Sequence, residues 1–367
     1  MKINRIDIQN FRGIKQAQVE GFKRINLLLG KNNAYKTSVL EAIFLSIGAT
    51  NPSLAVNINR FRNLRQSDVE DFRYIFYALN FRNSPLLKTY FDQQKQQRSL
   101  KITPHKRADS GHIVSDVSGE YFSGSSIDTR LEIEAVDGLS FETTIKEADK
   151  PANSYTSHLI LENTYTQTPN FTIDKPSAYQ ELMKGVFLFP NLPVPGLDSR
   201  LEKLMVRKAH HPIIEVLQSI DPAIQSISLG TNGMVYFDIG IDQLIPVGLA
   251  GDGIRRVLST LVAIADSPNG IILIDEIDNG LHYSSQATLM KALLQAAETY
   301  NVQIFATTHN YETLRKLIEV LQEKDMARHR EHVKVITLRR TENHSAKAYY
   351  YDYEKFHFAI EQEIEIR

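Results

Sequence analysis

A nine-residue stretch near the N-terminus has the residue types and spacing of a loop that binds phosphate groups. It lies between the apolar run 25–29 and the apolar-periodic segment 39–45, and consists of Gly30, Lys31, Asn32, Asn33, Ala34, Tyr35, Lys36, Thr37 and Ser38. It matches the pattern G-x-x-x-x-G-K-[ST] except at one position; in that pattern, backbone N–H groups and a helix N-terminus face the phosphates. The lysine of this pattern reaches the β- and γ-phosphates and the next hydroxyl binds Mg2+, so the stretch predicts a nucleotide site.

The exception is Tyr35, which stands where a glycine would let the backbone pass close to the phosphates. We expect a tyrosine there either to narrow the phosphate cradle or to hold an unusual backbone conformation, at a cost of about 1–3 kcal/mol. Slow turnover, or nucleotide binding without turnover, is therefore an open alternative. Taken alone, the stretch could also be an ordinary polar turn between a strand and a helix.

Two later apolar runs end in residues that suit the chemistry of a nucleotide site. The run 271–274 is followed by Asp275 and Glu276, and the run starting at 302 leads to His309. Ligands of α/β proteins sit at the carboxyl ends of such strands. We expect Asp275 to support Mg2+, Glu276 to orient or deprotonate the attacking water, and His309 to contact the γ-phosphate or that water.

A glycine-rich turn precedes the acidic run and opens a helix. It consists of Ala250, Gly251, Asp252 and Gly253. A helix N-terminus has unpaired N–H groups and a partial positive charge, so the turn is a second candidate anion site. Asp252 could instead be no more than a helix cap. The order of loop, turn, acidic run and histidine favours one nucleotide site over unrelated features.

Composition excludes several other classes of protein. The chain has 367 residues, of which 42% are apolar and 9% aromatic, enough for one large α/β domain or two domains. A net charge of -1 provides no overall attraction to nucleic acid or anionic membrane. The absence of cysteine excludes disulfides, thiolate zinc sites and thiol nucleophiles. With no signal-peptide pattern and no run of 18 apolar residues, we expect a cytoplasmic protein without membrane contact.

The periodicity of the chain predicts an α/β fold with a mixed or parallel central sheet flanked by helices. Residues 1–30 predict two or three short strands, 52–100 predict helices, and 100–189 predict short strands with polar connections. Further on, we expect a helix over 198–219, strands over 227–245, alternating helices and strands over 248–321, and last strands over 333–338 and 346–353.

Positive charge is concentrated between Arg60 and Arg107, where eleven Lys/Arg face four acidic residues, a net charge of +7. Basic residues beside aromatic side chains can bind the phosphates and bases of DNA. The candidates for this contact are Arg60, Arg62, Arg65 and Arg73. The alternative is a solvated helical face.

The four motifs together resemble the ABC-type ATPase heads of the RecF, SMC and OLD group, especially stand-alone AAA-family ATPases of prokaryotic defence operons. Residues 251–256 resemble the ABC signature, with Ala250 at the usual serine; residues 274–283 resemble the Walker B motif and D-loop; residues 308–310 resemble the switch histidine; and residues 10–13 resemble the opening strand-turn. The resemblance covers residues 1–48 and about 185–340.

This resemblance implies a P-loop NTPase of the ABC-ATPase head type that uses ATP and Mg2+. It implies three regions: an N-terminal lobe with the P-loop (1–50), an inserted helical and β-rich subdomain (51–185), and a C-terminal lobe with the signature, Walker B motif and switch histidine (186–367). Thr37 and Asp275 would hold the metal, Glu276 would be the general base, and His309 would sense the γ-phosphate. Arg12 would join the nucleotide contacts, and Gln66 would be the Q-loop residue.

Members of this group form head-to-tail dimers, so the resemblance implies a homodimer in which Ala250–Gly253 and His282 of one subunit meet ATP bound to the other. We expect an ATPase that hydrolyses ATP to ADP and phosphate and controls a separately encoded effector, such as a nuclease, in antiphage defence. The missing heptads and cysteines argue against a long tethering arm, and the 58 residues after His309 are too few for a nuclease domain. The alternatives are a RecF/SMC-like DNA-binding ATPase of DNA repair and a degenerate nucleotide-sensing scaffold.

Overall fold

The computed structural model describes residues 1–64, 68–92, 95–106, 136–162, 170–190, 194, 196–231 and 233–366; Arg65 and Gln66 lie outside these ranges. Within them, the central element is a 13-stranded sheet with the spatial order β8-β7-β6-β5-β4-β1-β2-β16-β15-β3-β14-β13-β9. Its strands are β1 (Ile3–Phe11), β2 (Ile14–Glu20), β3 (Ile25–Leu29), β4 (Leu86–Phe91), β5 (Gln96–Lys106), β6 (Val136–Glu147), β7 (Asn153–Leu161), β8 (Phe171–Asp174), β9 (Gly185–Leu188), β13 (Ile271–Ile274), β14 (Gln303–Thr307), β15 (Val333–Arg340) and β16 (Ala346–Tyr351).

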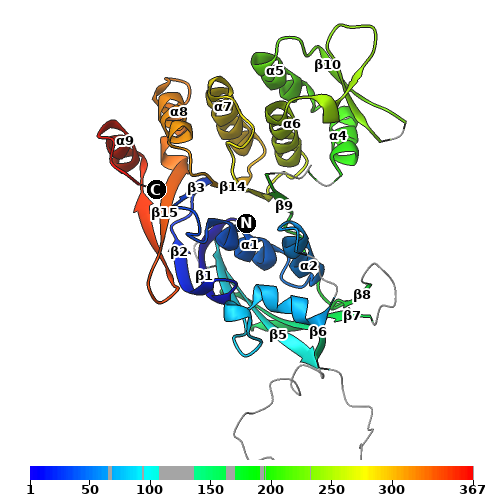
Figure 1. Cartoon of the computed structure of the whole chain (residues 1–367), viewed down its shortest axis with the longest axis vertical. Helices are drawn as coiled ribbons and strands as arrows, with labels where there is room; N and C mark the ends of the chain where they lie inside the picture. Colours follow the sequence, from blue (N-terminus) through cyan, green and yellow to red (C-terminus); the bar gives the residue numbers. More distant parts are fainter. Residues whose placement is uncertain are drawn as a thin grey trace, which may run out of the picture.

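The parallel part of this sheet consists of β9, β13, β14, β3 and β15. Every residue of β3, β13 and β14 is buried, as expected for strands covered on both faces, which read as continuous apolar runs. Helices cover one face: α4 (Leu197–Val206), α5 (His211–Ile220), α6 (Asp252–Ala265), α7 (Tyr283–Thr299) and α8 (Tyr311–Gln322) form a layer seen at the top of Figure 1. Their apolar side chains form one core with Leu27, Ile272 and Ile304.

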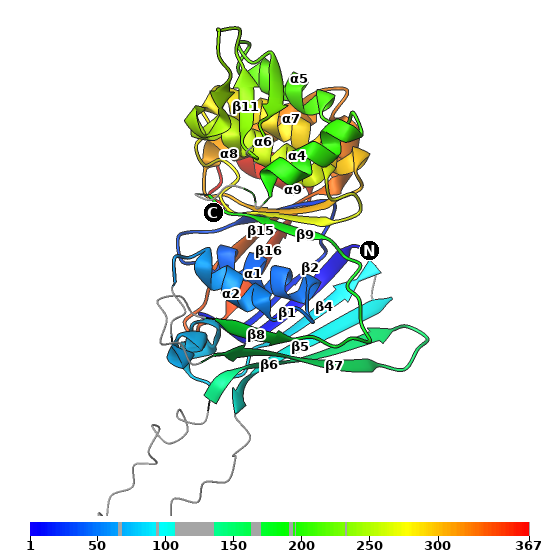
Figure 2. The same cartoon turned by 90° about the vertical axis from the view of Figure 1, so that its right-hand side faces the viewer.

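The other face of the parallel strands packs against α1 (Lys36–Ile47). A second core joins α1 to Phe305 and Leu273 above and to Phe91, Leu100 and Phe141 of the antiparallel strands. Figure 2 shows α1 and α2 (Ser53–Arg60) between the parallel strands and the antiparallel strands β4–β8. The sheet therefore curls around the helix that begins at the candidate phosphate loop.

The strands of the inserted region extend the same sheet. β4 pairs antiparallel with β1, and β5, β6, β7 and β8 follow in antiparallel register. The β-rich prediction for 100–189 is confirmed in the described residues. The three-region division at residues 50 and 185 stays a prediction.

The prediction of helices throughout 52–100 is wrong for its second half. Among the described residues of this range, helical turns are confined to α2 and the 3-10 segments η1 (Val69–Ile75) and η2 (Tyr77–Leu79), whereas 86–91 and 96–106 are strands. In β4 the buried residues are Leu87, Thr89 and Phe91, which is a period of two. A dense apolar and aromatic segment is ambiguous between helix and strand, and here pairing with β1 decides in favour of the strand.

The C-terminal half follows the predicted alternation of helices and strands. A small sheet of β10 (Ser226–Leu229), β11 (Val235–Asp238) and β12 (Ile245–Pro246) leads through η4 (Val247–Leu249) into α6. The 3-10 segment η5 (Ala327–His332) precedes β15. After β16 the chain forms α9 (Tyr353–Glu361), which was not predicted; Asp352 caps it by accepting a hydrogen bond from the Lys355 amide at 3.1 Å.

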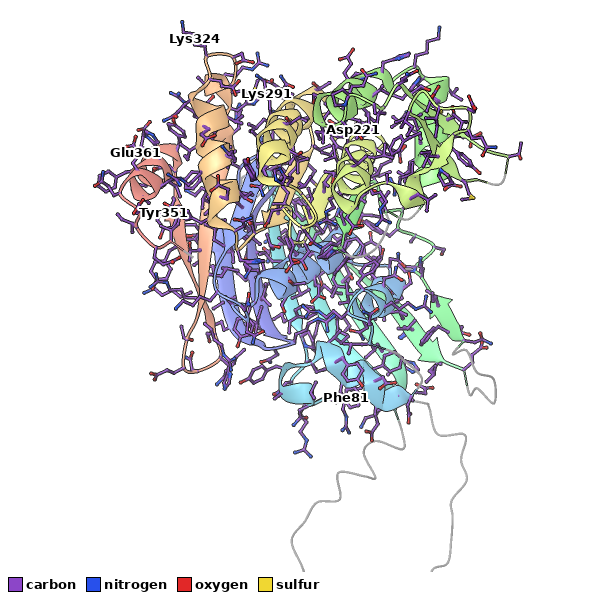
Figure 3. All side chains as sticks on the ribbon, turned by 45° about the horizontal axis from the view of Figure 1, so that its top comes forward. Phe81, Asp221, Lys291, Lys324, Tyr351 and Glu361 are labelled. Atoms are coloured by element: carbon purple, nitrogen blue, oxygen red, sulfur yellow. The ribbon has the colours of Figure 1, made fainter. Side chains whose placement is uncertain are left out.

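Charged side chains such as Lys291 and Lys324 lie on the outer side of the helical layer (Figure 3). Lys291 forms ion pairs of 2.6 Å with Glu323 and 3.2 Å with Asp325. None of the helices in the described ranges combines the length and apolar character that crossing a bilayer requires.

A buried ion-pair cluster ties the phosphate-loop helix to the start of the chain. Glu41 on α1 is fully buried, and its carboxylate lies 2.6 Å from Arg12 Nε and 2.6 Å from Arg62 Nε. Arg12 also donates to the carbonyls of Ile58 and Tyr74 and to Asn59 Oδ1, at 3.0–3.2 Å. The β1–β2 turn, α1 and α2 therefore share one carboxylate.

We predict that Glu41→Gln lowers the free energy of unfolding by about 3 kcal/mol, because it leaves the buried Arg12 guanidinium without its counter-charge. Urea denaturation followed by circular dichroism measures this loss. The matched control is Glu202→Gln on the exposed side of α4, which should leave the midpoint unchanged. Equal midpoints for Glu41→Gln and wild type would contradict the role given to this carboxylate.

Candidate nucleotide site

The candidate phosphate loop connects β3 to α1 and has the backbone conformation that such a loop needs. Gly30 has φ 144°, and a Cβ there would lie 2.5 Å from the Leu338 carbonyl oxygen, so only glycine fits. The Lys36 ammonium donates to the carbonyls of Gly30 at 2.7 Å and Lys31 at 3.0 Å. Lys31, Asn32 and Asn33 are exposed, whereas Ala34 and Ser38 are buried. Burial lowers the pKa of Lys36, while Asp275 and Glu276 act in the opposite direction.

Tyr35 adopts the conformation that glycine usually supplies, with φ 67° and ψ 13° at the N-cap of α1. Of the two expected consequences, the structure has the unusual backbone. The ring contacts residues outside the loop: a Cβ on Gly13 would meet Tyr35 Cε1 at 2.8 Å, and the Arg340 guanidinium lies 5.6 Å from the ring centroid. The hydroxyl is buried without a hydrogen-bond partner in the described structure. Burial raises the pKa of Tyr35, with the Arg340 charge opposing this shift.

The register of the parallel strands brings the loop and the acidic run to one edge of the sheet. Ile274 pairs with Ala306, which in turn pairs with Leu27, so the three strands end together. As a result, Thr37 Oγ1 lies 3.1 Å from Asp275 Oδ1 and 3.0 Å from Oδ2. The predicted metal-binding pair is therefore in contact across 238 positions of sequence.

Thr307, at the end of β14, is a member of the site that the sequence reasoning missed. Its hydroxyl donates to Asp275 Oδ1 at 2.6 Å and accepts from the Glu276 amide at 2.8 Å. The side chain is fully buried. Its position at the polar end of an apolar run is the signal that could have identified it. The sequence analysis instead gives the functional role at this strand end to the exposed His309, two residues later.

A hydroxyl and a carboxylate are hard oxygen ligands of the kind that Mg2+ prefers. In the part of the chain that the structure describes, no group of three or more His, Cys, Asp or Glu side chains could hold a metal ion. The donor set of Thr37 and Asp275 therefore fits a cation that takes its remaining ligands from phosphate oxygens and water, which is the usual arrangement for Mg2+ at nucleotides.

Glu276 follows Asp275 in a strained conformation, with φ 50°. Both of its peptide groups are held: the amide donates to Thr307 Oγ1, and the carbonyl accepts from the Asn279 amide at 3.0 Å and from Arg256 Nη2 at 3.3 Å. Its side chain is partly exposed. Positive φ at a non-glycine residue persists only where the surroundings over-determine it, and such residues concentrate at functional sites.

His309 lies at the exposed end of β14, beside the loop strand β3. On its C-terminal side Asn310 caps α8 by accepting from the Glu312 amide at 2.9 Å. On its N-terminal side, the Thr308 amide donates a hydrogen bond to the Leu28 carbonyl at 3.3 Å. His309 is thus held at the same sheet edge as the loop and Asp275.

The glycine-rich turn 250–253, which we call the signature turn, packs on the segment that follows Glu276. A Cβ on Gly253 would lie 2.7 Å from the Gly280 carbonyl oxygen, so these two backbones touch. Asp252 is the first residue of α6 and Gly251 is its N-cap, so the alternative of Asp252 as the cap is wrong. Asp252 pairs with Arg255. Gly251 and Asp252 are exposed and Ala250 is half-buried.

His282 belongs to this second group of predicted residues. It is exposed, and its ring contacts the Tyr283 ring in a tilted arrangement, with 4.2 Å between the ring centroids. The contact of Gly253 with Gly280 brings the turn 250–253 next to the segment that leads to His282.

Arg12 does not face the loop as a free cation, because its guanidinium lies in the buried cluster around Glu41. Burial lowers its pKa, with Glu41 opposing this shift. Its predicted contact with a nucleotide stays a prediction.

Of the four arginines proposed for DNA, Arg65 lies outside the described residues, and Arg62 and Arg73 are paired with carboxylates. Arg62 pairs with Glu41, so it could reach a phosphate only by leaving that carboxylate. Arg73 lies 3.9 Å from Glu70 and stacks over Phe81, whose position Figure 3 shows at the end of the molecule away from the helical layer. Arg60 is exposed. DNA binding through these residues stays a prediction.

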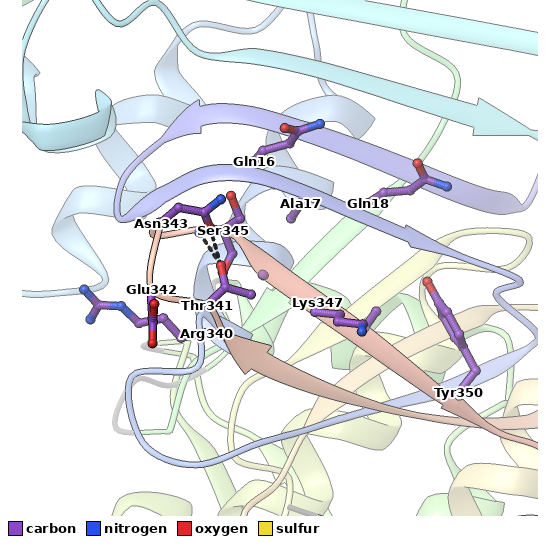
Figure 4. Close-up of a pocket in the computed structure, with 12 residues that line it drawn as sticks. Gln16, Ala17, Gln18, Arg340, Thr341, Glu342, Asn343, Ser345, Lys347 and Tyr350 are labelled. Atoms are coloured by element: carbon purple, nitrogen blue, oxygen red, sulfur yellow. Dashed lines mark hydrogen bonds between the residues drawn. The ribbon is translucent and has the colours of Figure 1, made fainter.

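A cavity of about 960 Å3 lies between β2 and the β15–β16 hairpin (Figure 4). Gln16, Gln18, Asn343, Lys347 and Tyr350 are among the residues that line it. A cavity of about 500 Å3 borders the loop itself at residues 31–34, together with Arg339, Arg340 and Glu365. Arg340 lines both cavities, and neither of the two is lined by Glu276 or His309, so cavity size does not locate the catalytic candidates.

We predict that Tyr35→Phe raises the free energy of unfolding by about 1 kcal/mol, because it removes a buried hydroxyl that has no partner. Thermal unfolding at low protein concentration measures the gain. Tyr236→Phe is the control, since that hydroxyl reaches Met234 Sδ on an exposed surface and its removal should be neutral. A clear loss of stability in Tyr35→Phe would mean that the hydroxyl is hydrogen-bonded.

A family model described as "AAA domain, putative AbiEii toxin, Type IV TA system" matches residues 49–315. A curated relative, an ATP/GTP phosphatase from Helicobacter pylori, is 25% identical over 350 residues, which cover 89% of this chain and 90% of the relative. A shorter match of 45 residues is 47% identical to the DNA replication and repair protein RecF of Nitrosococcus oceani and covers 12% of each chain.

Among solved structures, the Smc head domain with an extended coiled coil bound to the C-terminal domain of ScpA, from Pyrococcus furiosus, matches with a TM-score of 0.50 and 9% identity, covering 99% of each chain. The SMC head domain from Thermotoga maritima matches with a TM-score of 0.41 and 10% identity, covering 95% of this chain and 98% of that one. The predicted α/β head fold, with a mixed central sheet flanked by helices, is confirmed. The chain belongs to the AAA-domain family whose model it matches, and its fold is that of an SMC head domain.

Proposed function

We propose that this protein binds ATP with Mg2+ at residues 30–38 and hydrolyses it to ADP and phosphate. The observation that carries the proposal is the contact of Thr37 Oγ1 with both Asp275 carboxylate oxygens, at 3.1 and 3.0 Å, directly before Glu276. A hydroxyl and a carboxylate held together at the mouth of a phosphate loop suit a Mg2+ bound to nucleotide phosphates. The ATP/GTP phosphatase from Helicobacter pylori, similar over most of its length, supports the same chemistry.

Each residue has a defined task in this proposal. Lys36 exchanges its hydrogen bonds to the Gly30 and Lys31 carbonyls for the β- and γ-phosphate oxygens. Thr37 and Asp275 hold Mg2+, which when bound neutralises phosphate charge and orients the phosphate groups. Glu276 accepts a proton from the attacking water, and His309, at the end of the neighbouring strand, contacts the γ-phosphate side of the site.

Two departures from the usual motifs favour slow hydrolysis. Tyr35 keeps the loop in a glycine-like conformation at a cost in strain, and Ala250 lacks the hydroxyl that a signature serine would offer to the γ-phosphate. Asp275 and Glu276 are both present and held by Thr307, which favours turnover over a scaffold that only senses nucleotide.

The second part of the proposal is a head-to-tail homodimer closed by ATP. In this dimer, the cluster of residues 250–253 and His282 of one subunit meets the nucleotide bound to the other; the backbone contact of Gly253 with Gly280 supports the grouping of these residues. Leu249 and Tyr283, next to this cluster, have 78% and 59% of their surface exposed. Exposed apolar side chains beside polar site residues suit a protein interface.

The third part concerns the biological role. The description of the matched family names a putative AbiEii toxin and a Type IV TA system, which supports a role in a defence system. We propose that the ATP state of the dimer controls a separately encoded effector, such as a nuclease, in the cytoplasm during antiphage defence.

We predict that Glu276→Gln lowers the rate of ATP hydrolysis by about 100-fold, because it removes the general base, while ATP binding is retained. Lys36→Ala should weaken the binding of ATP by about tenfold or more, because it removes a charge-assisted contact to phosphate. Phosphate release and the binding of a fluorescent ATP analogue measure the two effects.

Glu215→Gln, an exposed glutamate on α5, is the control for the first variant and should hydrolyse ATP at the wild-type rate. Wild-type protein that binds ATP without releasing phosphate would refute hydrolysis and support the nucleotide-sensing scaffold instead.

We predict that Glu276→Gln protein forms dimers when Mg2+ and ATP are added, since bound ATP is no longer consumed. Light scattering after size-exclusion chromatography measures the mass. Leu249→Asp in the same background should stay monomeric while still binding ATP, because it places a charge in the proposed interface. Val206→Asp is the matched control, since Val206 is an equally exposed apolar residue, on α4. A dimer that survives Leu249→Asp would place the interface elsewhere.

A further inference from the structure

The signature helix α6 carries a buried arginine that the proposed chemistry does not use. Arg256 lies in the second turn of α6, with only 7% of its surface exposed. The neighbouring buried residues of this helix are apolar or small, including Val257, Leu258 and Ala263. A charged group placed among them must have partners that offset its desolvation.

The partners of Arg256 are backbone carbonyls at the ends of two parallel strands. Its Nη1 donates to the Phe189 carbonyl at 2.5 Å, directly after β9. Its Nη2 donates to the carbonyls of Asp275 and Glu276, directly after β13. A planar guanidinium with several N–H donors can serve three carbonyls at once, which a lysine ammonium on a flexible stem does less well.

Arg256 stays charged in the interior, because a guanidinium does not lose its proton in proteins. Burial lowers its pKa to about 10, and the negative charges of Asp275, Glu276 and Asp278 act in the opposite direction. The guanidinium therefore remains protonated at neutral pH and its donors stay available to the carbonyls.

The carbonyl of Glu276 is one of two points that hold the strained backbone of this residue; it accepts from Arg256 Nη2 at 3.3 Å and from the Asn279 amide at 3.0 Å. The other point is its amide, which donates to Thr307 Oγ1 at 2.8 Å. The next amide, that of Ile277, donates to the Thr307 carbonyl at 2.9 Å. With φ at 50°, Glu276 directs its side chain differently from a residue in extended conformation. It keeps this strained conformation only while its amide and its carbonyl are both held by hydrogen bonds.

Arg256 also connects Glu276 to the signature turn. It lies one helical turn after Asp252, and α6 begins at the signature turn itself. At the same end of the helix, Gly253 touches the Gly280 backbone closely enough to exclude a Cβ. The signature turn, the segment 275–280 and the end of β9 are thereby joined through one side chain and one backbone contact.

We propose that Arg256 is a positioning residue that fixes the conformation of Glu276 and links it to the signature turn of the same subunit. The inference rests on the proposed function in that Glu276 is taken as the general base. Arg256 touches no nucleotide in this role; it acts through the carbonyls of Asp275 and Glu276. A signature turn that contacts the partner's nucleotide would then act on the general base of its own subunit through α6.

The first test compares Arg256→Met and Arg256→Lys with Arg200→Met. Arg200 also holds α6, but at its far end, through an ion pair of 2.8 Å with Asp266, so it controls for general loosening of the helix. Arg256→Met should lower kcat by about 100-fold with KM within about threefold of wild type, because a misdirected base affects the chemical step more than binding. Arg256→Lys should recover part of kcat, and Arg200→Met should keep all of it.

The second test asks whether Arg256 affects kcat through Glu276 or independently of it. In the Glu276→Gln background, Arg256→Met should cause little further loss of kcat, because both changes remove the same function. A multiplicative loss in the double variant, or wild-type kcat in both Arg256→Met and Arg256→Lys, would overturn the proposal.

The third test does not depend on activity. Amide hydrogen exchange of the segment 275–281 should be about tenfold faster in Arg256→Lys than in wild type, and unchanged in Arg200→Met, because the carbonyls of this segment lose a fixed donor. If wild-type protein fails to hydrolyse ATP, the proposed function falls, yet faster exchange would still support the positioning role. Unchanged exchange in both Arg256 variants would overturn it.

Discussion

The candidate site depends on the Asp275 carboxylate, because that group joins three segments that are distant in sequence. It accepts a hydrogen bond from Thr307 at the end of β14 and contacts Thr37 at the start of α1. These contacts exist because parallel strands in register end at the same edge of the sheet, so their polar tips converge. If β13 were displaced by one residue, Asp275 would point to the opposite side and the pair with Thr37 would be lost.

Buried arginines provide the second layer of organisation around this edge. Arg12 and Arg62 both form ion pairs with Glu41, on the helix that follows the loop. Arg256 donates hydrogen bonds to the carbonyls that follow β9 and β13. Strand ends leave carbonyls without ladder partners, and buried carbonyls need donors. A guanidinium supplies several donors from one side chain, which explains its use where turns are tight and water is excluded.

Much of the fold could be predicted from the periodicity of the sequence. The apolar runs 25–29, 271–274 and 303–306 were recognised as buried strands because parallel strands covered on both faces contain few polar residues. The segment 86–100 was assigned incorrectly, since its aromatic density fits either period until a partner strand is known. The helix α9 was missed because its cap, Asp352, follows a tyrosine-rich run that reads as continued strand.

The sequence by itself determined which residues could do chemistry: a lysine and a hydroxyl after a glycine-rich loop, and two carboxylates and a histidine after apolar runs. These assignments were accessible because the spacing of a motif within one segment is a local property. Only the tertiary structure decided that Thr37 meets Asp275, that Thr307 bridges Asp275 and Glu276, and that Arg12 and Arg62 belong to Glu41. Those contacts follow from strand register and helix packing, which are long-range properties that no spacing within a segment encodes.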